Sequence, residues 1–282
     1  MLRTRVISSI ILVILLMIIV FSGRTILGVG IFILALIGMH EYYNAISNAG
    51  YKPVRVVGYL LCTPILILGL TENFEKLGMY IESFKTINYL SFSLYAVLLI
   101  LFSVIIFLHD RYNLIDISLT IFGASYVAFL FSFIVLTRNM ENGFYLVWLI
   151  FIGAWSTDTF AYFTGVNFGK TKFLPAISAK KSLEGSIGGV VGCVLVTLLY
   201  GYYLNSNHLS GNISLIHFIV MGILNGIIAQ IGDWAASAIK RYVNIKDYGK
   251  IMPGHGGILD RFDSILFIAP VVYFYFTFAI IK

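Results

Sequence analysis

The sequence carries little charge and few residues that break or cross-link a chain. Only 11% of its 282 residues are acidic or basic, less than half of the roughly 25% found in ordinary soluble domains. Hydrophobic residues make up 59% of the chain, and its mean hydropathy is +0.93. This composition excludes a soluble globular domain and is typical of a membrane protein with several spans.

Cysteine is nearly absent. The two that occur, Cys62 and Cys193, both lie inside apolar segments, and their spacing matches neither a disulfide framework nor a metal site. We expect both to be buried, unreactive thiols. Low-complexity segments and internal repeats are also missing, so neither a flexible tail nor a repeat architecture is predicted.

The apolar runs predict an all-α, polytopic membrane helix bundle of about nine transmembrane helices, because each crossing needs roughly 20 apolar residues. The expected helices are 6–22, 26–48, 56–71, 89–108, 115–137, 143–166, 184–204, 213–240 and 262–281. The first follows Arg3 and Arg5 and precedes no small-residue cleavage site. We therefore expect a retained transmembrane helix rather than a signal peptide.

The placement of Lys and Arg predicts the orientation. With the N-terminus inside, fourteen of the nineteen basic residues fall on inner connections or at inner helix ends. The positive-inside rule then places the N-terminus and the loops of the second half on the cytoplasmic side of the cell (inner) membrane. Residues 1–140 hold almost no intramembrane charge, so we predict a membrane scaffold there, a dimer surface or a lipid-binding wall. Residues 141–282 are predicted to be the catalytic half.

Two polar features open this second half. Asp158 lies in an otherwise apolar span, where a carboxylate marks a functional site because burying charge in hydrocarbon is costly. An aspartate hydrogen-bonded within the bundle is the alternative. Further on, Lys180, Lys181, Ser182 and Glu184 precede a glycine-rich helix start. Lysines beside a helix N-terminus bind anions, which predicts a phosphate site, although a loop that only sets topology has the same charge.

The densest charge lies in residues 237–263, which read SAIKRYVNIKDYGKIMPGHGGILDRFD between two apolar segments. Just before and within it, Asp233, Ser237 and Lys240 are spaced at i, i+4 and i+7 and so share one face of a helix. This stripe ends at the predicted inner end of the eighth span. A passive connector does not need such a concentration of charge.

The remainder of that stretch combines lysines, a tight turn and two more acids. Lys246 and Lys250 precede the Pro-Gly-His-Gly-Gly turn, whose glycine backbone can approach a phosphate without interference from Cβ atoms. Asp260 and Asp263 follow, three residues apart and thus on one helical face.

The predicted topology brings the acidic residues Asp158, Glu184, Asp233 and Asp260 to one membrane face, together with most of the lysines. Mg²⁺ takes one or two protein carboxylates and completes its shell with phosphate oxygens and water. The constellation therefore predicts phosphoryl or nucleotidyl transfer at the inner leaflet.

The motif of residues 237–263 resembles the signature of the phosphatidate cytidylyltransferases, also called CDP-diacylglycerol synthases. The upstream runs DTFAYFTG and SAKKSLEG are similar to that family as well, and chain length and span count agree along the whole chain. The resemblance implies that CTP and phosphatidate react to give CDP-diacylglycerol and pyrophosphate, a step of phospholipid synthesis.

The resemblance also implies roles for single residues. Asp233 and Asp260 would bind Mg²⁺ and, with Lys240 and Lys246, be catalytic; a second ion such as K⁺ is left open. The implied substrate-binding residues are Asp158, Lys181, Ser182, Glu184, Ser237, Arg241, Lys250, His255, Gly256, Arg261 and Asp263. His255 would either protonate the leaving group or stabilise the turn. A homodimer surrounded by membrane lipid is implied, and no nucleic-acid partner.

Three other functions compete with this one. A CDP-alcohol phosphotransferase would need a DGxxAR-type helix, which the sequence lacks. A CTP-dependent lipid kinase of the polyprenol or phytol type would transfer the γ-phosphoryl group and release CDP instead of pyrophosphate. An inner-face anion transporter would place charge near the bilayer midplane and often shows repeats, unlike this chain.

Overall fold

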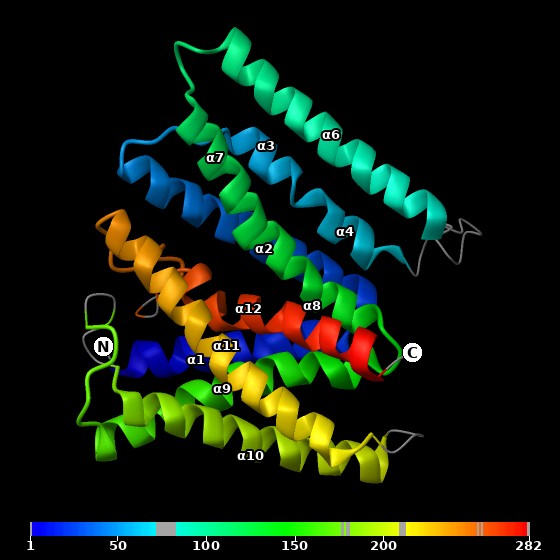
Figure 1. Cartoon of the computed structure of the whole chain (residues 1–282), viewed down its shortest axis with the longest axis vertical. Coiled ribbons are helices and arrows are strands. Elements are labelled where there is room, and N and C mark those ends of the chain that lie inside the picture. The colour runs from blue at the N-terminus through cyan, green and yellow to red at the C-terminus, as the bar shows by residue number, and fades with distance from the viewer. Residues whose placement is uncertain are drawn as a thin grey trace. The chain divides into compact units, whose positions relative to one another are not determined.

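Helices make up the regular structure of this chain in a computed structural model (Figure 1). The structure describes residues 2–71, 83–175, 178, 181–208, 213–252, 254 and 256–280, with side chains for all of these except 2–11 and 83–94. Two compact units are present, one formed by residues 11–132 and the other by residues 133–282 together with the first ten. The sequence-based boundary at residue 140 stays a prediction.

The helices follow the predicted order. They are α1 (Leu2–Phe21), α2 (Arg24–Asn48), α3 (Arg55–Leu60), α4 (Thr63–Gly69), α6 (Ser83–Phe107), α7 (Leu114–Gly123), α8 (Leu130–Asn139), α9 (Gly143–Phe168), α10 (Leu183–Asn207), α11 (Leu215–Tyr242) and α12 (Leu259–Tyr275). A π-helical segment, η1 (Ala124–Phe129), joins α7 to α8, and a second, η2 (Phe276–Ile280), extends α12.

The prediction of an all-helical, multi-pass membrane protein is confirmed. Within the described residues, six helical segments are long and apolar enough to cross a bilayer: Arg24–Asn48, Leu114–Asn139, Gly143–Phe168, Leu183–Asn207, Leu215–Tyr242 and Leu259–Ile280. The described parts of the other three expected spans form shorter apolar helices, Leu12–Phe21, Arg55–Gly69 and Tyr95–Phe107.

The third expected span, 56–71, differs from the prediction because it forms two short helices, α3 and α4, instead of one. Pro64 stands at the start of α4 and has no backbone N–H to donate to the carbonyl of Leu60. The hydroxyl of Thr63 donates to that carbonyl instead, at 2.7 Å. The chain thus breaks between α3 and α4, where the proline interrupts the backbone ladder.

In the unit of residues 11–132, α2 packs against α4 and against the α7–η1 segment (Figure 1). The backbones of α2 and α4 meet at two glycines, since a Cβ atom on Gly28 would overlap the Cα atom of Gly69. On its other side, α2 buries the rings of Tyr42 and Tyr43, and the Tyr43 hydroxyl donates to the carbonyl of Thr120 at 3.1 Å. This contact fixes the register of α2 against α7.

A buried aspartate holds the chain between α2 and α3 onto the start of α7. The carboxylate of Asp116 accepts hydrogen bonds from the backbone N–H groups of Lys52 at 2.6 Å and Asn113 at 3.0 Å. The Asn113 side chain in turn accepts from the Asp116 backbone, which completes a capping box. Asp116 is only 3% exposed, so this reciprocal arrangement satisfies groups that water does not reach.

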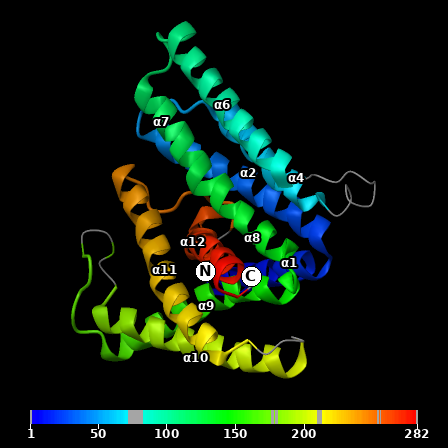
Figure 2. The ribbon, with the colours of Figure 1, turned by 45° about the vertical axis from the view of Figure 1, so that its right-hand side comes forward.

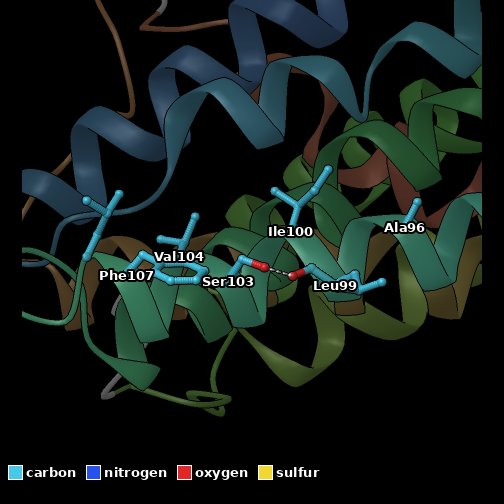
Figure 3. A pocket seen from close by; sticks show the side chains of 7 residues that line it. Ala96, Leu99, Ile100, Ser103, Val104 and Phe107 are labelled. Atoms are coloured by element: carbon cyan, nitrogen blue, oxygen red, sulfur yellow. Dashed lines mark hydrogen bonds between the residues drawn. The ribbon is translucent and has the colours of Figure 1, made fainter.

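The same unit contains an apolar groove of about 540 Å³ along α6 (Figure 3). Seven residues line it, among them Leu99, Ile100 and Phe107, and none of the seven is titratable. The hydroxyl of Ser103, its one polar side chain, donates to the carbonyl of Leu99 at 2.7 Å. The groove therefore offers no group for the predicted transfer chemistry.

In the other unit, α9, α10, α11 and α12 pack side by side in both ribbon views (Figure 1, Figure 2). Small residues make this possible. A Cβ atom on Gly189 would come within 3.0 Å of Ala161 in α9, and one on Gly226 within 2.8 Å of Val190 in α10. This close packing brings the charged helix ends of the second half together.

Candidate active site

A first ion pair joins the segment before α10 to α11. The ammonium group of Lys181 contacts the Oδ2 atom of Asp233, and the two side chains are 27% and 32% exposed. The Ser237 hydroxyl, one helical turn further along α11, lies 3.5 Å from the other carboxylate oxygen. The sequence placed Lys181 and Asp233 at one face, and the structure brings them into direct contact.

The Lys181 ammonium also lies over an aromatic ring. Its Nζ atom is 5.5 Å from the centre of the Trp234 ring, and Phe173 packs on that ring with centroids 5.2 Å apart. A cation at this distance from a ring face is attracted by the ring quadrupole. Lys181 is therefore held from two sides, by a carboxylate and by a ring.

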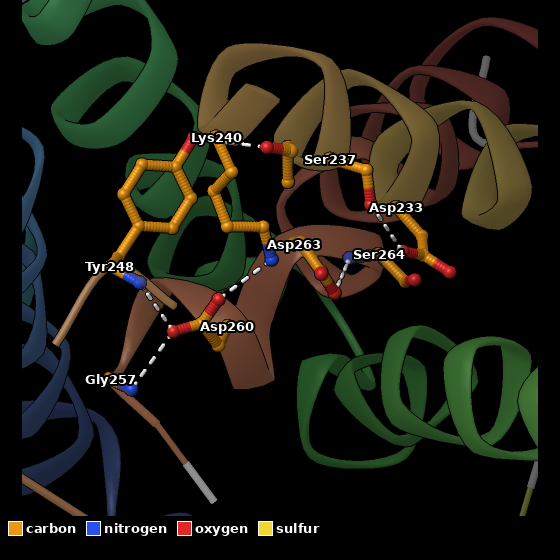
Figure 4. A network of polar contacts seen from close by, with 9 residues as sticks. Asp233, Ser237, Lys240, Tyr248, Gly257, Asp260, Asp263 and Ser264 are labelled. Atoms are coloured by element: carbon orange, nitrogen blue, oxygen red, sulfur yellow. Dashed lines mark hydrogen bonds and ion pairs between the residues drawn. The ribbon is translucent and has the colours of Figure 1, made fainter. Parts of the chain in front are cut away.

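A second ion pair joins the end of α11 to the start of α12 (Figure 4). The ammonium group of Lys240 lies 2.7 Å from the Oδ1 atom of Asp260, with side chains 13% and 2% exposed. The Oδ2 atom of Asp260 accepts from the backbone N–H groups of Tyr248 at 2.8 Å and Gly257 at 2.9 Å. All four groups belong to the stretch with the densest charge.

Two glycines of the turn, Gly256 and Gly257, lie against this buried carboxylate. Gly256 has φ of 92°, a left-handed conformation that favours glycine. A Cβ atom there would lie 2.8 Å from the Oδ2 atom of Asp260, so a larger residue would also displace the carboxylate. The turn was predicted to approach a phosphate closely; in the structure the backbone N–H of Gly257 donates to Asp260. His255 and Pro253 lie outside the described residues, as does Lys180.

Three carboxylates, from α9, α11 and α12, interact electrostatically with one another. Asp263, near the start of α12, interacts electrostatically with Asp233, Asp158 and Lys240, and its Oδ1 atom accepts from the backbone of Ser264 at 2.8 Å. Asp158, on α9, interacts with Asp233 and with two cations, Lys181 and Arg261. Of the four acids that the sequence placed at one face, Asp158 and Asp233 interact with each other here, whereas Asp260 is paired with Lys240.

Ser182 and Glu184 make a different set of contacts. The Ser182 hydroxyl caps α10 by accepting from the backbone of Gly185 at 3.2 Å. The Glu184 carboxylate accepts from the backbone N–H groups of Lys170 and Thr171, both at 3.1 Å. These bonds tie the loop between α9 and α10 to the helix start and so fix the place of Lys181. Their predicted substrate-binding roles stay predictions.

Four further basic side chains predicted for the site are exposed: Arg241, Lys246, Lys250 and Arg261. No hydrogen bond or close ion pair holds any of them to another residue in the part of the chain that the structure describes. They flank the loop from α11 to α12 and the first turn of α12. Arg261 interacts electrostatically with Asp158. Exposed cations attract phosphate-bearing ligands, whose charge they can neutralise.

The sequence did not single out Trp234 and Tyr248. Trp234 lies under Lys181, and Tyr248 lies under Lys240, again 5.5 Å from ring centre to Nζ. Aromatic residues make up 16% of the chain, so no local signal distinguishes these two rings from lipid-facing or core rings.

The donor set suits Mg²⁺ held jointly with phosphate. Among the described residues, no three His, Cys, Asp or Glu side chains are grouped so as to hold a metal by themselves. Mg²⁺ needs only one or two carboxylates when phosphate oxygens complete its shell, and Asp233, with Asp158 and Asp263 near it, meets that need. The Asp260 oxygens already accept from three donors, which fits a structural clamp better than a metal ligand.

Comparison with known proteins agrees with this geometry. The family model described as "Cytidylyltransferase family" matches residues 3–279. The chain belongs to the cytidylyltransferase family. The match extends over both compact units, so the family resemblance includes the N-terminal helices as well as the charged cluster.

Several members of the cytidylyltransferase family are similar to this chain over most of their length. Proteins named phosphatidate cytidylyltransferase from Staphylococcus haemolyticus (strain JCSC1435) and Staphylococcus aureus (strain COL) are each 32% identical, covering 96% of this chain and 97% of the relative. One from Bacillus subtilis (strain 168) is 32% identical and covers 78% of this chain and 77% of its own.

Proposed function

We propose that this member of the cytidylyltransferase family transfers the cytidylyl group of CTP to phosphatidate, giving CDP-diacylglycerol and pyrophosphate for phospholipid synthesis. The observation that carries the proposal is the similarity over 96% of the chain to proteins named phosphatidate cytidylyltransferase. The cluster of carboxylates and cations at the ends of α9 to α12 supports it, because both reactants are phosphates.

The reaction needs charge neutralisation more than proton transfer. A phosphate monoester carries about −1.5 to −2 charges at pH 7, so the attacking oxygen of phosphatidate is already a nucleophile. It forms a bond to the α-phosphorus of CTP, and the bond from that phosphorus to the bridging oxygen breaks, with the electron pair leaving on pyrophosphate. The chain's task is to hold two anionic reactants in line and to stabilise the leaving group.

The basic residues of the site fall into two groups, one held by carboxylates and one exposed. Lys181 and Lys240 are fixed by carboxylates, and each ammonium group has further N–H donors for a phosphate oxygen. Arg241, Lys246, Lys250 and Arg261 are exposed and provide the outer attraction for CTP phosphates or the phosphatidate headgroup. Asp158, Ser237, Gly256 and Asp263 complete the site, for which His255 remains the proposed acid or turn residue.

A magnesium ion bound by Asp233, with Asp263 or Asp158 beside it, would supply positive charge to the reacting phosphates and the leaving pyrophosphate. Asp233 can take this role because its carboxylate is about one-third exposed, and beside the contact with Lys181 it has a hydrogen bond from Ser237 that is long at 3.5 Å. The resemblance also assigns Asp260 as a ligand and leaves open a second ion such as K⁺. A metal ion held by Asp260 would require the hydrogen bonds around this carboxylate to rearrange.

The positive-inside count supports a cytoplasmic N-terminus and a catalytic face at the cytoplasmic side of the cell membrane. All of the proposed site residues lie between residues 158 and 263, which supports a catalytic half at 141–282 and a scaffold at 1–140. A homodimer follows from the family resemblance, and the long apolar helices leave ample surface for it in lipid.

The test uses the full chain purified in detergent with CTP, Mg²⁺ and phosphatidate. We expect CDP-diacylglycerol and pyrophosphate in equal amounts, loss of turnover when EDTA removes the metal, and at least a 100-fold loss in Asp233→Asn. Asp110→Asn, at a side chain that is 94% exposed in the other unit, is the matched control and should keep full activity. Release of CDP would indicate a lipid kinase, and absence of any product would overturn the proposal.

A further inference from the structure

The two ion-paired lysines of the site, Lys181 and Lys240, each have one carboxylate and one aromatic ring as partners. Lys181 is placed between Asp233 and Trp234, and Lys240 between Asp260 and Tyr248, with the same 5.5 Å from Nζ to ring centre. A lysine side chain has a flexible four-carbon stem and three N–H donors. An ion pair with one carboxylate fixes one N–H donor and leaves the ammonium free to rotate about that bond. The aromatic ring restricts this rotation.

Tyr248 has the more extensive contacts of the two rings (Figure 4). It is 6% exposed, its ring lies beneath Lys240, and its hydroxyl donates to the carbonyl of Ala236 at 3.4 Å. Ala236 lies one helical turn before Lys240, so the ring runs along the stretch of α11 that carries the lysine. Its backbone N–H donates to Asp260, the partner of the same lysine, at 2.8 Å.

We propose that Tyr248 is a positioning residue, whose ring holds the Lys240 ammonium so that its remaining N–H donors face the Asp233–Asp263 side of the site, where the reacting phosphates bind. Asp260 takes one donor of Lys240, the ring covers a second direction, and Lys240 interacts electrostatically with Asp263 on the remaining side. The proposal rests on the proposed function for the identity of the phosphate ligands, but the holding of Lys240 does not depend on it.

Side-chain substitutions separate the ring from the backbone. The bond from the Tyr248 backbone N–H to Asp260 remains in any variant except proline. Tyr248→Phe keeps the ring and loses the hydroxyl contact, which is long at 3.4 Å. Tyr248→Met keeps an apolar side chain of similar length and loses the ring face. We expect the Phe variant to retain kcat/KM within about threefold, and the Met variant to lose about tenfold.

Two readouts distinguish positioning from a general loss of structure. First, Tyr248→Met should lower kcat/KM of the wild-type chain, but it should cause little further loss in a chain that already carries Lys240→Met. In a chain that carries Lys181→Met, it should cause its full loss of kcat/KM. Secondly, acylation of lysines, followed by peptide mass spectrometry, should show Lys240 reacting about tenfold faster in Tyr248→Met than in Tyr248→Phe, because the ring no longer shields it. Lys246 is exposed and serves as the internal reference in the same sample.

A series of fluorinated side chains, which keep the shape of the ring at position 248, provides the test if Tyr248→Met does not fold. Phenylalanines with one, two or three ring fluorines at position 248 weaken the cation–ring attraction stepwise while keeping the ring. The logarithm of kcat/KM should fall steadily along the series. Equal kcat/KM along the series, or unchanged Lys240 acylation in Tyr248→Met, would overturn the proposal. If the wild-type chain makes no CDP-diacylglycerol, the proposed function fails, and the acylation result alone decides the role of Tyr248.

Discussion

Asp260 is expected to be a structural clamp, and replacing it by asparagine tests this. Its carboxylate is 2% exposed and accepts from three donors, of which the Lys240 ammonium is one. In Asp260→Asn the amide oxygen can still accept from the backbone groups of Tyr248 and Gly257. The buried ammonium then loses its close ion-pair partner, since the amide carries no charge and its nitrogen is itself a donor.

The size of the loss follows from burial. Removing one partner of a buried ion pair costs about 3–5 kcal/mol, and the retained amide bonds place Asp260→Asn at the lower end, about 3 kcal/mol. This corresponds to a shift on the order of 100-fold in the ratio of folded to unfolded protein. Asp233→Asn is the matched control, because Asp233 and Lys181 are 32% and 27% exposed. A pair that water reaches contributes about 1 kcal/mol or less.

The assay is unfolding by sodium dodecyl sulfate in mixed micelles, followed by far-ultraviolet circular dichroism, with EDTA present so that no metal contributes. We expect Asp260→Asn to unfold at clearly lower detergent fraction than wild type and Asp233→Asn to unfold close to wild type. The reasoning is refuted if Asp260→Asn matches wild type in EDTA. It is equally refuted if its loss of stability appears only with Mg²⁺, since that would make Asp260 a metal ligand rather than a clamp.

Two further predictions concern the unit of residues 11–132 and use the same unfolding assay. Gly28→Val should destabilise by about 2–3 kcal/mol or prevent folding, because a Cβ atom there overlaps Gly69, whereas Val29→Leu, at an exposed site, should not; equal midpoints would exclude the close backbone contact. Asp116→Ala should cost about 2 kcal/mol by leaving two backbone donors unpaired, whereas Asp110→Ala should stay within about 0.5 kcal/mol, and a loss of equal size in both would exclude the clamp.

The course of the helices could be predicted from the sequence because a transmembrane helix is a local property of composition and length. The predicted spans 143–166 and 184–204 correspond to α9 (Gly143–Phe168) and α10 (Leu183–Asn207). The break at Pro64 was missed although its cause is also local. Hydropathy alone averages over a proline, whereas the missing hydrogen bond to Leu60 depends on the register of single residues.

The candidate site could be predicted only in part, because its specific pairs and its backbone hydrogen bonds are not visible in residue types and spacing. Counting basic residues brought Lys181 and Asp233, 52 positions apart, to one face, but not into a specific pair. The partners of Asp260 could not be read from residue types, since two of them are backbone N–H groups that any residue but proline provides. The rings of Trp234 and Tyr248 were missed for a similar reason in a chain rich in aromatic residues.

Each of the two ion pairs has one member on α11, and these two members lie one after the other along the helix axis. Asp233 and Lys240 are seven residues apart, which is about 10 Å along a helix axis. The length and apolarity of α11 allow it to cross a bilayer, and in a bilayer that it spans this distance would lie roughly along the membrane normal. The site would then offer charge at two depths, about 10 Å apart. One depth can receive a ligand from water while the other meets a headgroup that stays in its lipid layer, so neither reactant has to leave its own phase.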